Sequence, residues 1–326
     1  MRIAFFSTQP YDRTYFEKHP DGHQFMFLET VLDEQSVAMA VGCDGVCVFV
    51  NDRLSAKVVD ELHRLGVRLI LLRCAGFNNV DLAAAHRAGI CVARVPAYSP
   101  HAVAEHALAL VMTLNRKTHK AYNRVREGNF SLDRLAGFDL FGKTVGVIGT
   151  GKIGAVFCRI MLGMGCRVLA FDLVEDAALS KAGVRYLPLI DLLEQSDIVS
   201  LHCPLNEQTR HIIGAQTLPH LKQGVMLINT GRGGLIDTAL LVGALKSGKI
   251  GYLGLDVYEQ EEKLFFADWS EKLIQDDLIL RLIGFPNVLI TAHQGFFTDE
   301  ALRQIADTTL HNLDEFAAEG TCSNRL

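Results

Sequence analysis

The sequence lacks a run of 18 uninterrupted apolar residues, so we expect no membrane-spanning helix. Its opening residues, MRIAFFSTQPYDR, are too short an apolar stretch for a secretory signal. It also lacks a strong excess of either charge, with a formal net charge of −5 at pH 7. Nucleic acids and anionic membranes are therefore not expected partners, and anionic substrates must be bound by local groups.

Patterns that bind metals or form disulfides are also missing. There is no C-x-x-C pair, and His101 and His106 are five residues apart, so they do not share a helix face as a zinc-binding i, i+4 pair would. The cysteines are scattered through mostly apolar runs, which is typical of reduced thiols in a cytoplasmic protein. They are Cys43, Cys47, Cys74, Cys91, Cys158, Cys166, Cys203 and Cys322.

A glycine-rich pattern typical of dinucleotide binding lies near the middle of the chain. The apolar run Val145–Ile148 predicts a buried strand, and a helix is predicted at Ala155–Met164. Between them Gly149, Gly151 and Gly154 form G-x-G-x-x-G. The first glycine permits a tight turn, the second leaves room for a pyrophosphate, and the third lets helix and strand pack closely.

The residues around this pattern strengthen the interpretation. N–H groups near Lys152 and Ile153 point outward at a helix start, where the helix dipole favours an anion. A second strand, Arg167–Phe171, ends on Asp172, whose carboxylate can accept both ribose hydroxyls of NAD and would repel the 2′-phosphate of NADP. The alternative is a glycine-rich turn that binds no ligand.

The 326 residues are enough for two domains with buried cores. Residues 1–98 alternate strand-like and helix-like segments, which predicts a parallel sheet covered by helices. The two prolines of Val95–Pro100 end this series, and a second one begins after Phe138–Lys143, so we place a nucleotide-binding domain at about 100–294. The remaining strands are expected at Ile3–Phe6, Gly45–Val50, Leu69–Leu72, Ile90–Val92, Ile198–His202, Val225–Asn229, Tyr252–Leu255 and Val288–Thr291, and first-domain helices at Ala56–Leu65 and Val80–Ala88.

Two long helices flank the second series. The segment His101–Arg116 is apolar nearly all round, so it should be buried at a domain junction or in a subunit interface. The basic stretch Arg116–Arg126 is interpreted as a solvated face. The last segment, Thr298–Ala318, has one apolar stripe, which does not by itself say where the helix packs.

Three chemically suited side chains follow separate strands of the second series. In an open parallel sheet, ligands bind at the carboxyl ends of the strands. Arg232 would bind a substrate carboxylate and polarise the neighbouring carbonyl. His293 would donate a proton as hydride arrives, and Glu261 would favour its charged, proton-donating form. Together they form the set that reduction of a 2-keto acid requires, whereas a histidine alone at a strand end is more often structural.

Other strand ends carry less specific signals. His202, Cys203 and Pro204 are expected to form a wall near the adenosine of the cofactor, because a nucleophilic cysteine would need a base that the sequence does not identify. The N–H groups of Ala75 and Gly76 follow a strand of the first domain and could hold a substrate carboxylate. The alternative for these two residues is a simple turn.

The chain resembles the D-isomer-specific 2-hydroxyacid dehydrogenases over nearly its full length, and within them the fermentative D-lactate dehydrogenases. The resemblance rests on RCAGFNNVDL, VPAYSPHAVAEHA, GVIGTGKIG, SLHCPL, INTGRGGLID, LDVYEQE and TAHQGFFT. It implies two doubly wound α/β domains, a flavodoxin-like catalytic domain at 1–99 plus about 295–326 and an inserted Rossmann-type NAD domain at 100–294. The final helix would then return to the first domain.

The resemblance also implies the site and its ligands. Arg232, Glu261 and His293 would be the catalytic residues, and Thr209 is a less certain cofactor contact because some lactate enzymes have Asn there. Cofactor contacts map onto Gly149, Gly151, Lys152, Ile153, Gly154, Asp172, Cys203, Pro204, Thr209, Thr230, Gly231, Arg232 and Asp256, with the last near the nicotinamide carboxamide. Substrate contacts map onto Ala75, Gly76, Tyr98, Arg232 and Phe296.

The implied activity is the reversible, metal-free reduction of pyruvate to D-lactate by NADH. A bulky Phe296 would favour the methyl group of pyruvate over longer side chains. A dimer or tetramer is implied, with helix 101–116 in the subunit interface. The alternatives are another 2-keto acid (phenylpyruvate, hydroxypyruvate, glyoxylate or 2-ketobutyrate) or an NADH-sensing binding protein such as the transcriptional corepressors of this fold.

Overall fold

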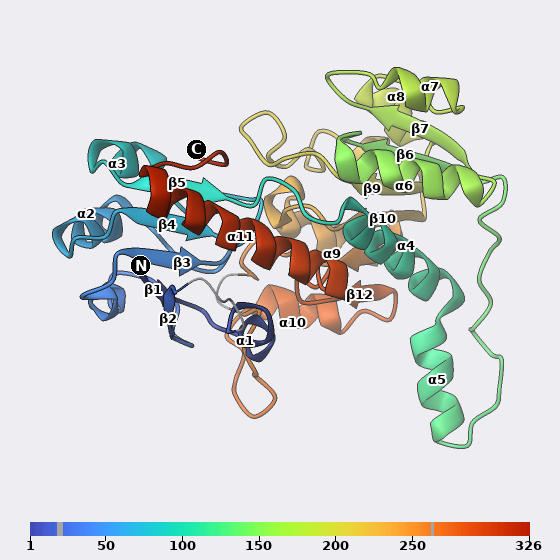
Figure 1. Ribbon diagram of the computed structural model, residues 1–326. Helices are drawn as coiled ribbons and strands as arrows, with labels where there is room; N and C mark the ends of the chain where they lie inside the picture. Colours follow the sequence, from blue (N-terminus) through green and yellow to red (C-terminus); the bar gives the residue numbers. More distant parts are fainter. Residues whose placement is uncertain (18–21, 262–263) are drawn as a thin grey trace. The chain divides into compact units, whose positions relative to one another are not determined.

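The computed structural model describes residues 1–17, 22–261 and 264–326. The chain forms two compact units, Met1–Ser99 with Phe297–Leu326 and Pro100–Phe296 (Figure 1). Each unit contains its own parallel sheet with helices on both faces, so the predicted α/β class with two doubly wound sheets is confirmed.

The first unit is built on five parallel strands in the order β2-β1-β3-β4-β5. This is the 2-1-3-4-5 order of flavodoxin-like sheets. The three central strands are fully apolar or nearly so, because both faces of a parallel sheet are covered. The strands are β1 (Arg2–Phe5), β2 (Gln24–Phe27), β3 (Gly45–Val48), β4 (Leu69–Leu72) and β5 (Cys91–Arg94).

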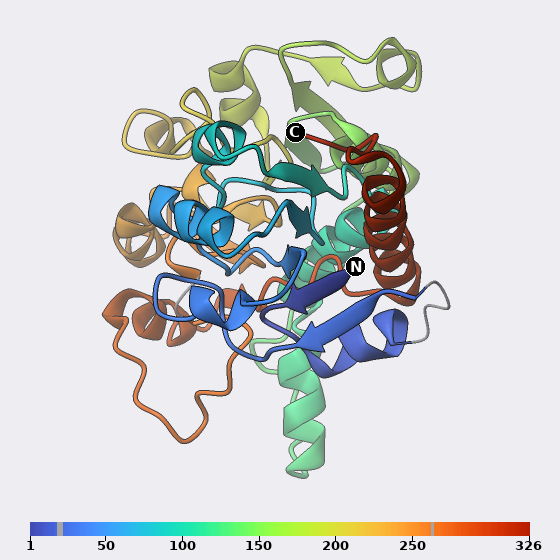
Figure 2. The ribbon, with the colours of Figure 1, turned by 60° about the vertical axis from the view of Figure 1, so that its left-hand side comes forward.

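Helices cover both faces of this sheet. Figure 2 shows α2 (Ala56–Arg64) and α3 (Leu82–Arg87) on one side, and α1 (Pro10–Phe16) and α11 (Asp299–Glu319) on the other. The apolar stripe of α11 packs into the core of the first unit with the side chains of β1, β4 and β5. A short 3₁₀ helix, η1 (Val37–Ala40), precedes β3.

The second unit contains seven parallel strands in the order β12-β11-β10-β9-β6-β7-β8. Counted from β6, this is the Rossmann order 3-2-1-4-5-6 extended by one strand. The chain order reverses between β6 and β9, and ligands of such sheets bind beyond the carboxyl ends of the strands there. The strands are β6 (Thr144–Ile148), β7 (Arg167–Phe171), β8 (Arg185–Tyr186), β9 (Ile198–Leu201), β10 (Val225–Asn229), β11 (Ile250–Leu255) and β12 (Val288–Ile290).

Two apolar cores fill the faces of this second sheet. One joins α4, α6 and α7 to the strands, and the other joins α8, α9 and α10. No helix in the described ranges is long and apolar enough to cross a membrane. The helices are α4 (Pro100–Arg116), α5 (Thr118–Arg126), α6 (Lys152–Gly163), α7 (Ala177–Lys181), α8 (Leu189–Gln195), α9 (Thr238–Lys246) and α10 (Asp277–Ile283), with 3₁₀ helices η2 (Leu218–His220) and η3 (Gly233–Leu235).

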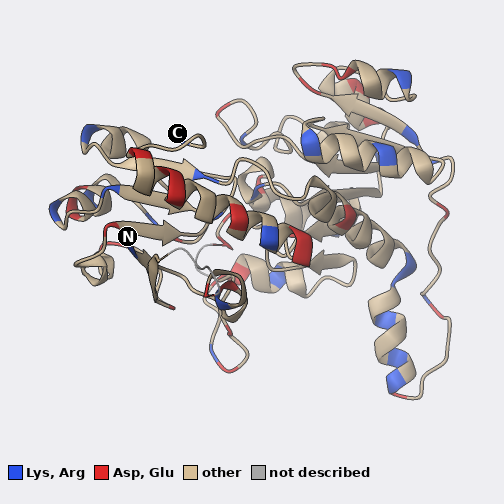
Figure 3. Ribbon diagram, viewed as in Figure 1, with Lys and Arg blue, Asp and Glu red and all other residues tan. Residues whose placement is uncertain are grey.

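The sequence pattern missed two edge strands and shifted one helix start. Strands β2 and β8 are edge strands with partly exposed side chains; the apolar run of β2 is short, and β8 spans only two residues. Helix α6 begins at Lys152 and not at Ala155, because Gly151 is the N-cap and the last glycine of the motif, Gly154, lies inside the first turn. The basic segment forms α5, a helix with no buried residue, as a solvated face requires (Figure 3).

Helix α6 packs closely against the turn that precedes it at one glycine. A Cβ at Gly154 would lie 1.9 Å from the backbone oxygen of Gly149, a separation that no real contact allows. Gly163, at the other end of α6, has no atom within 4 Å of the same position. The helix can therefore accept a methyl group at one of these two sites only.

We expect Gly154→Ala to lower the free energy of unfolding by at least about 2 kcal/mol, because the helix must move away from a rigid backbone. The matched variant Gly163→Ala should be neutral or stabilising by up to about 1 kcal/mol, because alanine restricts the unfolded chain. Urea denaturation of both variants measures the difference. Equal stabilities for the two variants would contradict the packing described here.

Candidate active site

The three glycines after β6 occupy three different environments. Gly149 has φ +93°, a left-handed conformation that disfavours side chains, and its Cβ would lie 2.4 Å from the backbone nitrogen of Cys203. Gly151 is exposed and has no atom within 4 Å of a Cβ position. Open space over Gly151, next to the exposed start of α6 at Lys152, is what the approach of a pyrophosphate requires.

Asp172 directly follows β7, with its carboxylate partly exposed and held by the glycine turn. Its Oδ2 accepts hydrogen bonds from the backbone N–H of Thr150 at 2.5 Å and from the Thr150 hydroxyl at 3.1 Å. Tyr186 donates its hydroxyl to the same threonine at 3.0 Å. Partial burial raises the pKa of Asp172, but the backbone and hydroxyl donors lower it by more than this. The net pKa is below its ordinary value, so the side chain is a carboxylate.

The segment after β9 lies directly against the glycine turn. His202 Nε2 lies 2.8 Å from the Ser200 hydroxyl, and its ring centre lies 4.9 Å from that of Phe157. Burial lowers the pKa of His202 to about 3, so the ring is neutral. Burial also raises the pKa of the Cys203 thiol to about 11, which disfavours a nucleophilic thiolate.

Pro204 and Thr209 belong to the loop that follows. The Thr209 hydroxyl donates to the carbonyl oxygen of Pro204 at 2.6 Å and accepts the N–H of Asn206 at 2.8 Å. These bonds close the loop on itself. Both residues are therefore placed by local turn contacts, at the strand end next to the glycine turn.

The chain after β10 forms a tight polar turn. Asn229 accepts the N–H of Gly231 at 3.0 Å and donates its side-chain amide to the Arg232 carbonyl at 2.9 Å. The guanidinium of Arg232 is partly exposed and donates to the Gly231 carbonyl at 2.8 Å. The hydroxyl oxygen of Thr230 is buried and has no hydrogen-bond partner among the described residues. Such an orphaned group in a ligand-binding turn fits a dinucleotide that supplies the partner.

His293 and Glu261 form a partly buried pair. His293 Nδ1 lies 2.8 Å from Glu261 Oε1, and the two side chains are 12% and 16% exposed. The other carboxylate oxygen of Glu261 accepts the backbone N–H of Tyr258 at 2.8 Å. Glu261 is therefore fixed on one side by the backbone and fixes the imidazole on the other, leaving Nε2 of His293 as the ring nitrogen that can serve a substrate.

Asp256 holds the backbone around His293. Its carboxylate accepts the N–H of Gln294 at 2.9 Å and that of Gly295 at 2.8 Å, and its own carbonyl accepts the N–H of His293 at 2.7 Å. The Thr291 hydroxyl donates to the same carboxylate at 2.5 Å. Burial raises the pKa of Asp256, and the hydrogen bond and charge of His106, followed by the Thr291 hydroxyl and the nearby His293, outweigh that effect and lower it.

Sequence reasoning missed part of this network. His106, interpreted from the sequence as a structural residue and not a metal ligand, lies 3.2 Å from the Asp256 carboxylate and 3.0 Å from the Thr291 hydroxyl. No pattern links a helix residue to a strand end 150 residues later. Thr291 stands in the same TAHQG segment as His293, and that adjacency was the one signal that could have pointed to it.

The remaining predicted substrate contacts are divided between the two units. Ala75, Gly76 and Tyr98 are half-buried residues of the first unit. Phe296 belongs to the second unit and is 6% exposed. The structure thus places Arg232, Glu261, His293 and Phe296 in one unit, in the segments that follow the ends of β10, β11 and β12.

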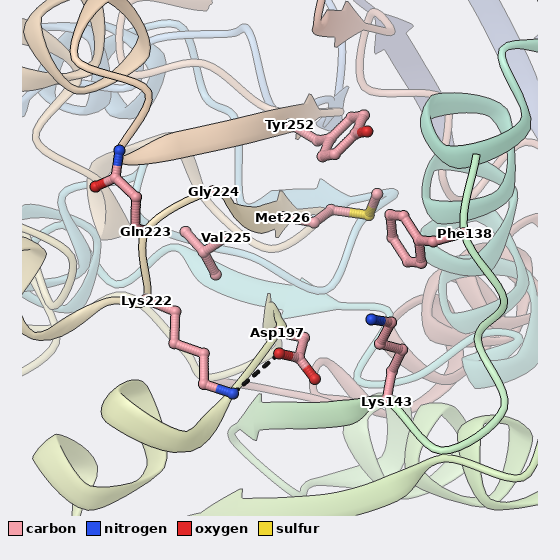
Figure 4. Close-up of a pocket in the computed structure, with 9 residues that line it drawn as sticks. All are labelled: Phe138, Lys143, Asp197, Lys222, Gln223, Gly224, Val225, Met226 and Tyr252. Atoms are coloured by element: carbon pink, nitrogen blue, oxygen red, sulfur yellow. Dashed lines mark hydrogen bonds and ion pairs between the residues drawn. The ribbon is translucent and has the colours of Figure 1, made fainter. Parts of the chain in front are cut away.

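A pocket of about 180 Å³ lies at the opposite edge of the second sheet, where β6, β9 and β10 begin. Figure 4 shows Lys222 donating to Asp197, at 2.9 Å. Lys143 lies on the other side of the pocket, with Nζ 5.3 Å from the centre of the Phe138 ring. This pocket lies at the amino ends of the strands, whereas the residues described above lie at their carboxyl ends. The pocket is therefore separate from that site.

Strand order, glycine turn and terminal aspartate define the second unit as a Rossmann-type dinucleotide-binding domain. Comparison with known proteins agrees. Residues 108–295 match the family model described as "D-isomer specific 2-hydroxyacid dehydrogenase, NAD binding domain". This span is more than half of the chain, and NAD is therefore the cofactor.

Known relatives match over the whole length. The chain is 51% identical to 2-hydroxyacid dehydrogenase A of Aspergillus oryzae, over 100% of this chain and 95% of that protein. It is 50% identical to the D-lactate dehydrogenase of Escherichia coli, over 100% of both, and the apo-structure of that enzyme superposes with a TM-score of 0.91. The D-lactate dehydrogenase of Aquifex aeolicus, solved with NAD and lactic acid, is 32% identical over 98% of both chains with a TM-score of 0.88.

The chain belongs to the D-isomer specific 2-hydroxyacid dehydrogenase family. It is an NAD-dependent oxidoreductase, as the resemblance of its motifs predicted.

We expect protonation of His202 to destabilise the protein at low pH. The unfolded state takes up this proton near pH 6.5 and the folded state only near pH 3, so the free energy of unfolding falls as the pH drops below about 6.5. Between pH 7.5 and 5, His202→Gln should remove about 1–2 kcal/mol of this loss. Urea denaturation at the two pH values measures it.

The control is His101→Gln, which removes an exposed histidine of the same unit. It should leave the pH dependence of wild type unchanged. If His202→Gln and His101→Gln give the same pH dependence, the buried, neutral state of His202 is wrong.

Proposed function

We propose that this protein reduces pyruvate to D-lactate with NADH, reversibly. The observation that carries the proposal is the pair of His293 and Glu261, joined at 2.8 Å within the NAD-binding unit. A positioned imidazole next to a carboxylate is what proton transfer to a ketone oxygen needs. The 50% identity to an enzyme named D-lactate dehydrogenase supports pyruvate as the substrate.

Bound NADH supplies the hydride that reaches the carbonyl carbon of the substrate. Arg232 binds the substrate carboxylate and polarises the carbonyl, and the charged His293 donates its Nε2 proton to the carbonyl oxygen. Glu261 keeps the imidazole oriented through its contact with Nδ1. In the reverse direction His293 accepts the proton from the hydroxyl of D-lactate.

The cofactor contacts are part of the same proposal. Asp172 accepts hydrogen bonds from the hydroxyls of the adenosine ribose. The pyrophosphate is held by the turn at Gly149, Gly151 and Gly154 together with Lys152 and Ile153. Cys203 and Pro204 line the adenosine side, with Thr209 in the same loop. Thr230, Gly231, Arg232 and Asp256 line the nicotinamide side, where the unpartnered hydroxyl of Thr230 supports a bound ligand.

The substrate contacts extend to the other predicted residues. The N–H groups of Ala75 and Gly76 hold the substrate carboxylate, and Tyr98 and Phe296 border the substrate. A bulky, buried Phe296 restricts the space for the substrate side chain and thereby favours a methyl group. In this proposal residues 1–99 plus about 295–326 are the catalytic domain, and residues 100–294 are the NAD domain.

We also propose a homodimer or homotetramer in the cytoplasm. Helix α4, expected in the interface, packs within its own unit on α6, β10 and β11. Large apolar side chains are exposed instead on α5 and the segment after it, which supports a subunit contact there. They are Tyr122, Val125, Phe130, Leu132 and Phe141. The eight free cysteines support a reducing compartment.

A steady-state assay over a panel of 2-keto acids tests the substrate. We expect the highest kcat/KM for pyruvate with NADH, and a much lower one with NADPH because Asp172 repels the 2′-phosphate. Phenylpyruvate, hydroxypyruvate, glyoxylate and 2-ketobutyrate are the competing substrates. A higher kcat/KM for one of these acids would make that acid, and not pyruvate, the substrate. NADH binding without turnover of any 2-keto acid would indicate the sensor function instead.

Replacement of His293 tests the proton donor. We expect His293→Gln to lower kcat by about 10²–10⁴-fold and to leave the Kd for NADH, measured by fluorescence, nearly unchanged. His311 pairs with Glu315 at 3.2 Å on the exposed face of α11, so His311→Gln is a matched control that should keep wild-type kcat. A His293→Gln variant with kcat near that of wild type would exclude this mechanism.

A further inference from the structure

The loop after β4 has its carbonyl groups turned toward the protein. The Cys74 carbonyl accepts the N–H of Val95 at 3.2 Å, the Ala75 carbonyl accepts Nη1 of Arg94 at 2.9 Å, and the Gly76 carbonyl accepts the Cys74 thiol at 3.2 Å. Three successive carbonyl oxygens are thus fixed by groups of the same unit.

This arrangement sets the direction of the N–H groups. In a planar trans peptide the C=O and the N–H point in opposite directions, and the described chain contains no cis peptide. A bond to the Ala75 carbonyl therefore directs the N–H of Gly76 away from Arg94. In the same way, the bond from the Val95 N–H to the Cys74 carbonyl directs the N–H of Ala75 away from Val95. No described residue accepts a hydrogen bond from either N–H.

Arg94 is itself firmly placed. It ends β5, its backbone N–H donates to the Asn324 carbonyl at 3.2 Å, and its carbonyl accepts the amide of Asn312 at 3.0 Å. The guanidinium carbon lies 5.0 Å from the centre of the Phe77 ring, a cation–π contact. The side chain thus contacts the loop at Ala75 and again two residues later.

The charge of Arg94 is not matched by an acid. Among the ion pairs of the described residues, none involves Arg94. A half-buried guanidinium bonded to a carbonyl polarises that peptide, which makes its N–H a stronger donor to an anion. A positive charge one peptide away from two unpartnered N–H groups favours a carboxylate as the ligand.

We propose that Arg94 is a positioning residue for the 2-keto acid. It fixes the Ala75–Gly76 peptide so that the two N–H groups of the loop receive the substrate carboxylate, without touching the substrate itself. This inference rests on the proposed function, in which these N–H groups bind the substrate.

Arg94→Met tests the inference, because methionine keeps the apolar stem and removes the guanidinium. A hydrogen bond to a charged group contributes about 1.5–3 kcal/mol, so we expect the KM for pyruvate to rise by about 10–100-fold, with kcat reduced less than about threefold. The inhibition constant of oxamate, a pyruvate-shaped carboxylate, should rise by the same factor. The Kd for NADH should stay within about twofold of wild type.

Two further variants separate positioning from general stability. Arg94→Lys keeps the charge and should restore part of the oxamate affinity, and it replaces the methionine variant if that variant does not fold. Arg87→Met removes an exposed arginine of α3 in the same unit and should leave every constant unchanged. A merely structural role would change the NADH Kd and the melting temperature along with the KM, and would not give selective recovery by lysine.

The results distinguish the inference from the function on which it rests. If wild type turns over no 2-keto acid, the proposed function and the inference both fail. If wild type reduces pyruvate and Arg94→Met keeps its KM and oxamate affinity, only the role of Arg94 is overturned. If Arg94→Met loses NADH affinity to the same extent as oxamate affinity, the positioning role of Arg94 is likewise overturned.

Discussion

The hydrogen bonds of the buried Asp256 carboxylate are the interactions on which the His293–Glu261 pair depends. His293 has φ +53°, a left-handed conformation that costs a non-glycine residue about 1 kcal/mol or more. The chain keeps this conformation because Asp256 binds the backbone on both sides of the turn, through its own carbonyl and through both carboxylate oxygens. His106 and Thr291 complete the carboxylate's partners, so the charge is buried without being left unpaired. The orientation of the imidazole toward Glu261 is therefore a consequence of backbone hydrogen bonds made by a neighbouring acid.

The turn after β6 in the same sheet depends on glycines, because their lack of side chains permits close backbone contacts. The turn after β6 and the segment after β9 approach so closely that a Cβ at Gly149 would collide with the backbone of Cys203. The N-terminal end of α6 is held against the same turn at Gly154. These contacts leave Gly151 as the exposed member of the three, with free space above it. Two of the glycines thus build the turn, and the third is left open to the ligand.

Much of this could be predicted from the sequence, for identifiable reasons. Central strands such as Leu69–Leu72 and Val225–Asn229 are continuous apolar runs, and their predicted bounds match β4 and β10. Arg232, Glu261 and His293 follow predicted strands, so the carboxyl-end rule for parallel sheets was enough to single them out. The structure adds a close contact between the last two, at 2.8 Å. Strands β2 and β8 were not predicted, because the apolar run of β2 is short and β8 spans only two residues. The role of His106 could not be predicted either, since it depends on α4 packing beside β11 and β12, a contact that no local pattern encodes. The place of the final helix came from the family resemblance and not from its apolar stripe, because a stripe fits any apolar surface.

Asp256 and Arg94 act on the backbone in complementary ways. Asp256 is an anion that binds N–H groups and so fixes the path of the chain that carries His293. Arg94 is a cation that binds a carbonyl oxygen and so directs the N–H group of the same peptide away from itself. Each charge lies behind the group that would meet the substrate, and each transmits its effect through a rigid peptide. Motif matching finds the residues that face a ligand, because their chemistry is tied to the reaction. Asp256 and Arg94 each lie at a strand end and act through the backbone behind such residues. Their effect is recognised only when the hydrogen-bond partner of every backbone group has been identified.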